Sequence, residues 1–185
     1  MSDAALLITG IALWYAAHLF KRIAPGARKA MGGAGKGIVA LALVISIILM
    51  VFGYRGIDTA YLWHPPSWLI PVNNVLVLIA LFMLSPAARK GALLTRLRHP
   101  MLIGVLLWAV AHLMINGELA AVILFGGLGL WPLVEIVVIN HAEPDWQPGT
   151  KGALAKDGLF FLASVVLLGI IGYVHGLIGP PVFGV

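Results

Sequence analysis

GIVALALVISIILMVFGY, residues 37–54, is a run of eighteen residues without a charged side chain. A helix needs roughly 20 apolar residues to cross the ~30 Å hydrocarbon core of a bilayer, and this stretch comes close to that length. The core of a soluble protein of 185 residues could not hide this run together with the others like it. Residues 37–54 therefore predict a transmembrane helix.

The composition points to the same class of protein. Hydrophobic residues make up 61% of the chain and charged residues only 10%, whereas soluble domains carry about 25% charge. These values exclude a soluble enzyme, a disordered chain and a DNA-binding module. The net charge of +5 arises from basic residues between apolar runs, so we expect the lipid bilayer, and not nucleic acid, as a partner. The chain has no Cys, which excludes thiolate metal ligands and thiol nucleophiles.

Outward from residues 37–54, five more apolar segments have the composition of spanning helices. They cover approximately residues 4–20, 68–84, 100–115, 119–139 and 158–177. Pro100 stands in the first turn of its segment, where a helix tolerates proline, and Pro132 predicts a kink. The first segment lacks a preceding basic region and a cleavage site, so we expect a retained span. We predict an all-α fold, a polytopic transmembrane helical bundle of about six spans, with residues 1–185 as one integral-membrane domain.

The basic residues predict the orientation of this bundle. Eleven of the twelve Lys and Arg residues lie in the loops after the first, third and fifth spans, and only Arg55 lies on the other side. Because cytoplasmic loops carry an excess of Lys and Arg, we expect these three loops in the cytoplasm. Both termini would then face the periplasm of a bacterial inner membrane. Residues 86–97 either lie along the cytoplasmic interface or serve as a simple connector.

Histidines at membrane depth suggest a haem site. His18 and His112 lie within the first and fourth spans, where an ionisable group costs at least a few kcal/mol and tends to be functional. Two imidazoles on separate helices can ligate haem iron from both faces, and neighbouring alanines make room for a macrocycle. The alternative, that each His makes one interhelical hydrogen bond and binds nothing, stays open.

Glu135 is the most deeply placed carboxylate of the sequence. An acidic group in an apolar span should be paired or protonated, and its candidate partners are Arg98, His99 and His141. A purely structural role and a catalytic role are both open, so His99 and Glu135 are the candidate catalytic residues.

Three stretches resemble one known family. They are LWYAAHLFKR at residues 13–22, LRHPMLIG at residues 97–104, and residues 108–140 with Trp108, Ala111-His112-Leu113, Asn116-Gly117, Leu124-Phe125-Gly126-Gly127, Glu135 and Asn140. Together they resemble the NnrU family of bacterial membrane proteins. That family is named for an association with nitrite and nitric oxide reduction. The resemblance thus implies a role near denitrification, as a redox accessory or as a non-catalytic assembly factor for a nitrogen-oxide reductase.

The resemblance extends to the 15-cis-zeta-carotene isomerase, an NnrU-like membrane protein that uses haem b. Its ligand positions fall on His18 and His112 of this sequence, which implies haem b as cofactor and an isomerase-like activity on a hydrophobic small molecule. The exchange of a His ligand for Cys cannot be carried over, because the chain has no Cys. The haem propionates, being anionic, should lean toward Lys21, Arg22 or Arg98. Counting residues places His18 about 7 Å from the cytoplasmic boundary and His112 roughly twice as deep. If a haem cannot accommodate this difference in depth, His99 replaces His112 as the second ligand.

A second relative brings different chemistry. The isoprenylcysteine carboxyl methyltransferases share an Arg-His-Pro, a following Gly and a downstream Glu around S-adenosylmethionine, and here Arg98, His99, Pro100, Gly104 and Glu135 fit that outline. The tandem Glu pair usual in that group is missing, since Ile136 follows Glu135. A membrane methyltransferase is therefore the alternative function.

Overall fold

The computed structural model describes residues 2–58 and 60–183. The described helices are α1 (Asp3–Ile23), α2 (Pro25–Ala30), α3 (Ala34–Gly56), α4 (Leu69–Leu84), α5 (Ala87–Lys90), α6 (Pro100–Ile115), α7 (Leu119–Ala142) and α8 (Leu154–Ile178). Within this part of the chain no strand forms, apart from a single bridge between Tyr61 and Glu118. The all-α prediction is confirmed.

The six predicted spans correspond to α1, α3, α4, α6, α7 and α8. Four of them, α1, α3, α7 and α8, have 21 to 25 residues and are apolar and long enough to cross a membrane. The other two, α4 and α6, have 16 residues each, which gives about 24 Å at 1.5 Å per residue. Apolar side chains face outward along these helices, as with Phe52, which is 67% exposed. The chain is a multi-pass membrane protein.

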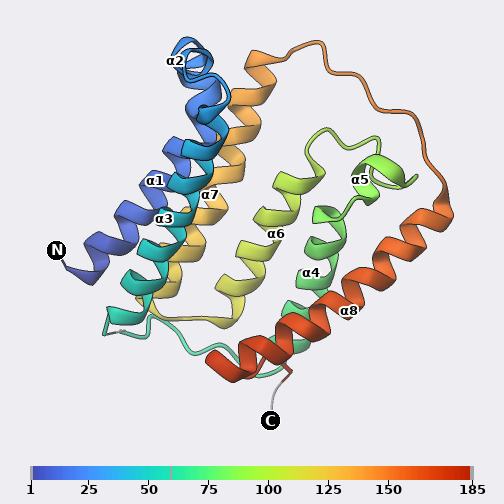
Figure 1. The fold of residues 1–185 in the computed structure, drawn as a ribbon. Coiled ribbons are helices and arrows are strands. Elements are labelled where there is room, and N and C mark those ends of the chain that lie inside the picture. The colour runs from blue at the N-terminus through green and yellow to red at the C-terminus, as the bar shows by residue number, and fades with distance from the viewer. Residues whose placement is uncertain (1, 59, 184–185) are drawn as a thin grey trace.

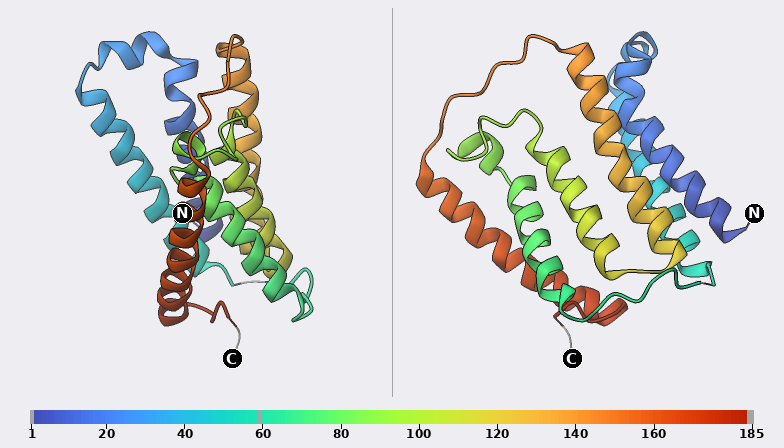
Figure 2. Two further views of the ribbon diagram at one scale, coloured as in Figure 1. Left: turned by 90° about the vertical axis from the view of Figure 1, so that its right-hand side faces the viewer. Right: turned by 180° about the vertical axis from the view of Figure 1, so that it is seen from behind.

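The spanning helices form a curved row (Figures 1 and 2). Their neighbours in space follow the order α3, α1, α7, α6, α4 and α8. The central position belongs to α7, which lies between α1 and α6 and contains Pro132 within its length. Two helices that are far apart in sequence, α1 and α6, thus both pack against α7. This order decides how the two intramembrane histidines are placed.

Glycines allow α1 and α3 to pack closely. A Cβ added at Gly53 of α3 would collide with the backbone of Leu7 and Asp3 in α1, and one added at Gly10 would lie 2.8 Å from the Ser46 carbonyl oxygen. Ser46 itself is fully buried and donates its hydroxyl hydrogen to the Leu43 carbonyl, at 2.7 Å. Small residues at such contacts let helix backbones approach, which favours association inside a bilayer.

The segment before α6 is anchored by a carboxylate of α8. Asp157, 2% exposed, accepts hydrogen bonds from the backbone N–H groups of Ala92 at 2.6 Å and Leu93 at 3.3 Å. Ala87 and Leu94 pack with Met83 in one buried cluster. Residues 86–97 therefore form a packed connector between α4 and α6, which favours the simpler of the two predicted roles.

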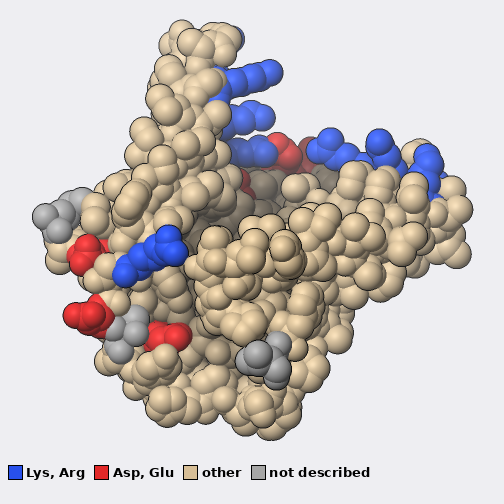
Figure 3. All heavy atoms as spheres, turned by 60° about the horizontal axis from the view of Figure 1, so that its bottom comes forward, with Lys and Arg blue, Asp and Glu red and all other residues tan. Residues whose placement is uncertain are grey.

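The two ends of the bundle differ in charge. Figure 3 shows most Lys and Arg side chains in one band, and a separate group of acidic side chains beside a single basic one. Basic residues occupy the last turns of α1, α2 and α5, whereas on α3 Arg55 lies in the last turn, at the opposite end. The helix arrangement thus gathers the basic loops that the sequence assigned to one side.

Candidate functional site

The imidazole of His18 is held by its own helix. Its Nδ1 lies 3.0 Å from the Trp14 carbonyl oxygen, one turn earlier in α1. The ring packs between two indoles, with centroid distances of 4.3 Å to Trp14 and 4.4 Å to Trp131 of α7. Because a carbonyl oxygen can only accept, Nδ1 carries the hydrogen and Nε2 keeps its lone pair.

His112 on α6 repeats this construction. Its Nδ1 lies 2.8 Å from the Trp108 carbonyl oxygen, again four residues earlier. The ring packs between Trp108 at 4.8 Å and Phe125 of α7 at 4.6 Å. An imidazole whose Nδ1–H is bound to a carbonyl, with Nε2 free, is the form that usually ligates metal ions in proteins. In both histidines Nε2 is therefore the nitrogen that keeps its lone pair.

The two histidines lie at different levels of α7. His18 contacts Trp131 and His112 contacts Phe125, six residues apart along α7, or about 9 Å along its axis. No contact joins the two imidazoles within residues 2–58 and 60–183. The donor chemistry fits haem iron, which needs one nitrogen lone pair on each face.

One of the alanines next to His112, Ala109, takes part in helix packing. Ala109 and Ala111 are completely buried. The Ala109 methyl lies 3.1 Å from the position that a Cβ at Gly129 of α7 would take, so two small residues, Ala109 and Gly129, meet where α6 packs against α7. Helix packing is the physical reason for a small residue at this position.

Unpartnered polar atoms surround His18. The indole N–H groups of Trp14 and Trp131 and the Oε2 of Glu135 are buried without a hydrogen-bond partner. Trp131, which packs on His18, and Glu135 lie one turn apart on α7 and are 6% and 8% exposed. The predicted burial of Glu135 is thus confirmed.

The predicted partners of Glu135 are wrong. The Nε2 of His99 lies 2.8 Å from Oδ1 of Asn140, and Arg98 donates to the backbone carbonyl of Glu143. No ion pair of Glu135 with Arg98, His99 or His141 occurs in the described part of the chain. The two candidate catalytic residues, His99 and Glu135, are likewise not joined by a hydrogen bond or an ion pair there.

Two of the three predicted propionate partners, Arg22 and Arg98, converge on the end of α7. Arg22 forms an ion pair with the Glu143 carboxylate, while Arg98 donates to the Glu143 carbonyl and lies 5.9 Å from the Trp146 ring centroid. The hydrogen bond from Arg22, aided by the charges of Lys21 and Arg98, lowers the pKa of Glu143. Any other anion at this point must compete with Glu143.

One residue of the methyltransferase outline, Gly104, has a structural role in the fold. Gly104 is buried, and a Cβ there would lie 3.0 Å from the Ala80 carbonyl oxygen of α4. Gly104 thus serves the packing of α4 against α6, a role that needs no cofactor.

Sequence reasoning missed the aromatic partners of the site, although a Trp stands four residues before both His18 and His112 and was a visible signal.

These features define a polytopic membrane protein with two Trp-flanked histidines inside its helices. The chain matches the family described as NnrU protein over residues 6–182, nearly its whole length. It belongs to the NnrU family, and the match includes the last span, where the resemblance in sequence was weakest. No curated protein and no solved structure is significantly similar to it.

Proposed function

We propose that this NnrU-family protein binds haem b inside the membrane and that Nε2 of His18 and Nε2 of His112 would hold its iron. One observation carries the proposal: each imidazole donates Nδ1–H to the carbonyl of a Trp one turn earlier, which leaves Nε2 free. When bound, haem supplies one-electron redox chemistry at its iron. The residues of the chain orient the two donors and exclude water around them.

The alternative of a purely structural His pair is less well supported. A histidine that only locks two helices together would hydrogen-bond a neighbouring helix, yet His18 and His112 each bond a carbonyl of their own helix. His99, the alternative second ligand, already has its Nε2 beside Asn140. These contacts favour His112 over His99 as the second ligand.

The role of the haem follows from the family and the surroundings of the site. We propose a redox accessory or an isomerase-like protein acting on a hydrophobic small molecule, working beside nitrogen-oxide reduction. The orphaned Glu135 carboxylate near His18 could hold or pass a proton. A nitrogen-oxide reductase as partner, and S-adenosylmethionine as an alternative cofactor, stay predictions from resemblance.

Haem stoichiometry tests this proposal. Purified protein in detergent, titrated with haem b, should saturate at one haem per chain, because one pair of Nε2 donors is available. The pyridine haemochrome assay after gel filtration measures the bound amount. Protein that elutes colourless after the titration would contradict the proposal.

We further propose an inner-membrane location with both termini in the periplasm, supported by the basic residues collected at one end of the bundle. Alkaline phosphatase, which is active only in the periplasm, should be active when fused after Gly179 and inactive when fused after Gly149. A cytoplasm-only reporter should give the opposite pattern. Phosphatase activity at Gly149 would reverse the orientation.

A further inference from the structure

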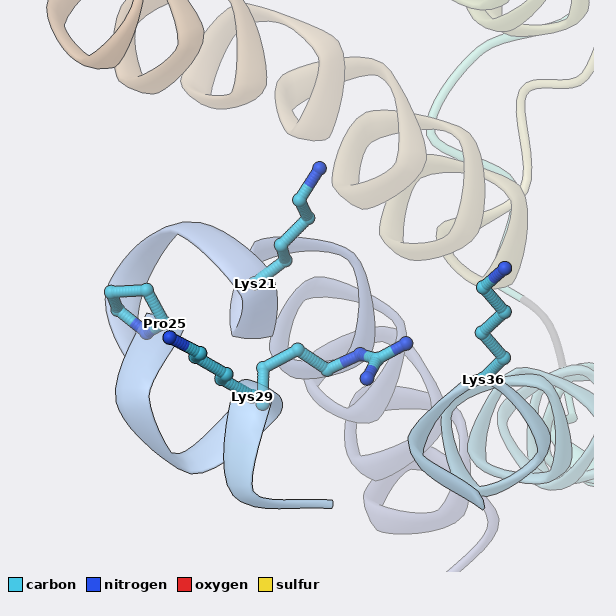
Figure 4. Close-up of a pocket in the computed structure, with 5 residues that line it drawn as sticks. Lys21, Pro25, Lys29 and Lys36 are labelled. Carbon is cyan, nitrogen blue, oxygen red and sulfur yellow. The ribbon is translucent and has the colours of Figure 1, made fainter. Parts of the chain in front are cut away.

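A basic hollow lies where α1, α2 and α3 meet. It has a volume of about 440 Å³ and is lined by Lys21, Pro25, Arg28, Lys29 and Lys36. Figure 4 shows that its lining comes from three elements, with Lys21 on α1, Pro25 and Lys29 on α2, and Lys36 on α3. Four of the five lining residues carry a positive charge, and none is acidic.

The residues of the α1–α3 connection explain how this hollow forms. Pro25 begins α2 in the first-turn position that suits proline, so the chain turns sharply after α1. The guanidinium of Arg28 then lies against the backbone of Gly35, where any Cβ would collide with it. Gly35 is buried for this reason, whereas a Cβ at the nearby Gly37 would meet open space. The same guanidinium donates a hydrogen bond to the Gly32 carbonyl oxygen, at 3.3 Å.

The positive charges of the hollow lack a carboxylate partner. Within residues 2–58 and 60–183 the one Lys or Arg ion pair joins Arg22 to Glu143, and neither residue lines the hollow. Cations gathered around one cavity repel one another unless an anion neutralises them. Lysine and arginine near a membrane surface attract anionic lipids with about 1 kcal/mol per residue.

The surroundings favour a lipid as the source of this anion. Directly beyond Lys36 along α3, Ile38 and Leu41 are 49% and 59% exposed, as expected for side chains that contact acyl chains. Basic side chains next to outward-facing apolar ones are the arrangement expected where polar headgroups meet hydrocarbon. We propose that it binds the phosphate group of an anionic phospholipid, with Arg28 and Lys36 as the principal contacts. The proposal does not depend on haem.

Native mass spectrometry of the detergent-purified full chain tests the site. The probes are dioleoylphosphatidylglycerol, dioleoylphosphatidylcholine and inorganic phosphate. Phosphatidylglycerol should bind at least tenfold more tightly than phosphatidylcholine. In Arg28→Gln/Lys36→Gln its affinity should fall about 25-fold, or fivefold for each charge removed. The matched control is Arg89→Gln/Lys90→Gln on α5, a second exposed basic pair, and it should stay within twofold of the wild type.

Three outcomes would overturn the proposal. Equal losses in the two double variants would show that binding follows total charge and not this hollow. Equal affinities for phosphatidylglycerol and phosphatidylcholine would show that the hollow does not select an anionic lipid. Inorganic phosphate that binds as tightly as phosphatidylglycerol would assign the hollow to a soluble phosphate.

Discussion

His18→Ala and His112→Ala should each abolish low-spin haem binding, because each change removes one axial nitrogen from the iron. The remaining imidazole can hold only a five-coordinate, high-spin haem or lose it altogether. Absorption and electron paramagnetic resonance spectra of the purified variants measure the spin state. His64→Ala is the control, since His64 is exposed and stacks on Tyr61 outside the spans.

Misfolding must be separated from ligand loss in these variants. In His18→Gly and His112→Gly, free imidazole added to the buffer should restore the low-spin spectrum, as it would fill the missing ligand position. A His112 variant that keeps its low-spin spectrum, together with a His99→Ala variant that loses it, would instead make His99 the second ligand.

Gly53→Val should prevent α1 and α3 from packing. The new side chain would meet the backbone of Leu7 and Asp3, and a rigid backbone cannot yield as a side chain can. Overpacking typically costs about 1–3 kcal/mol, and this backbone contact should lie at or above the upper limit. The midpoint of thermal unfolding in detergent and the yield of monodisperse protein should both drop sharply.

The matched control for this substitution is Gly169→Val. Gly169 lies in the spanning helix α8, and a Cβ there meets nothing within 4 Å. Its unfolding midpoint should stay close to that of the wild type. Equal loss of stability in both variants would mean that valine harms these helices through conformational preference alone, and not through the α1–α3 contact.

The spans were predictable because their ends are chemically marked. Pro100 and the charged residues before it determine where α6 begins, so its predicted range 100–115 agrees with the structure. Basic residues mark the end of α1 in the same way. Proline, charge and the loss of apolar residues act locally, and sequence alone therefore reveals them.

The surroundings of the candidate site could not be predicted, since they depend on the order of helices in space. Nothing in the sequence places α7 between α1 and α6, which brings Trp131 to His18 and Phe125 to His112. The same arrangement takes Arg98 to Glu143 and leaves Glu135 without its expected partners. Contacts between distant segments follow from packing that no local pattern records.

The central claim is that His18 and His112 form one bis-imidazole haem site. The most direct measurement is the absorption spectrum of the detergent-purified, haem-loaded protein, oxidised and then reduced with dithionite. We predict a sharp Soret band, with well-resolved α and β bands on reduction, typical of six-coordinate low-spin haem b with two nitrogen ligands. A broad high-spin spectrum in both states, or no absorption beyond that of free haem, would contradict the account.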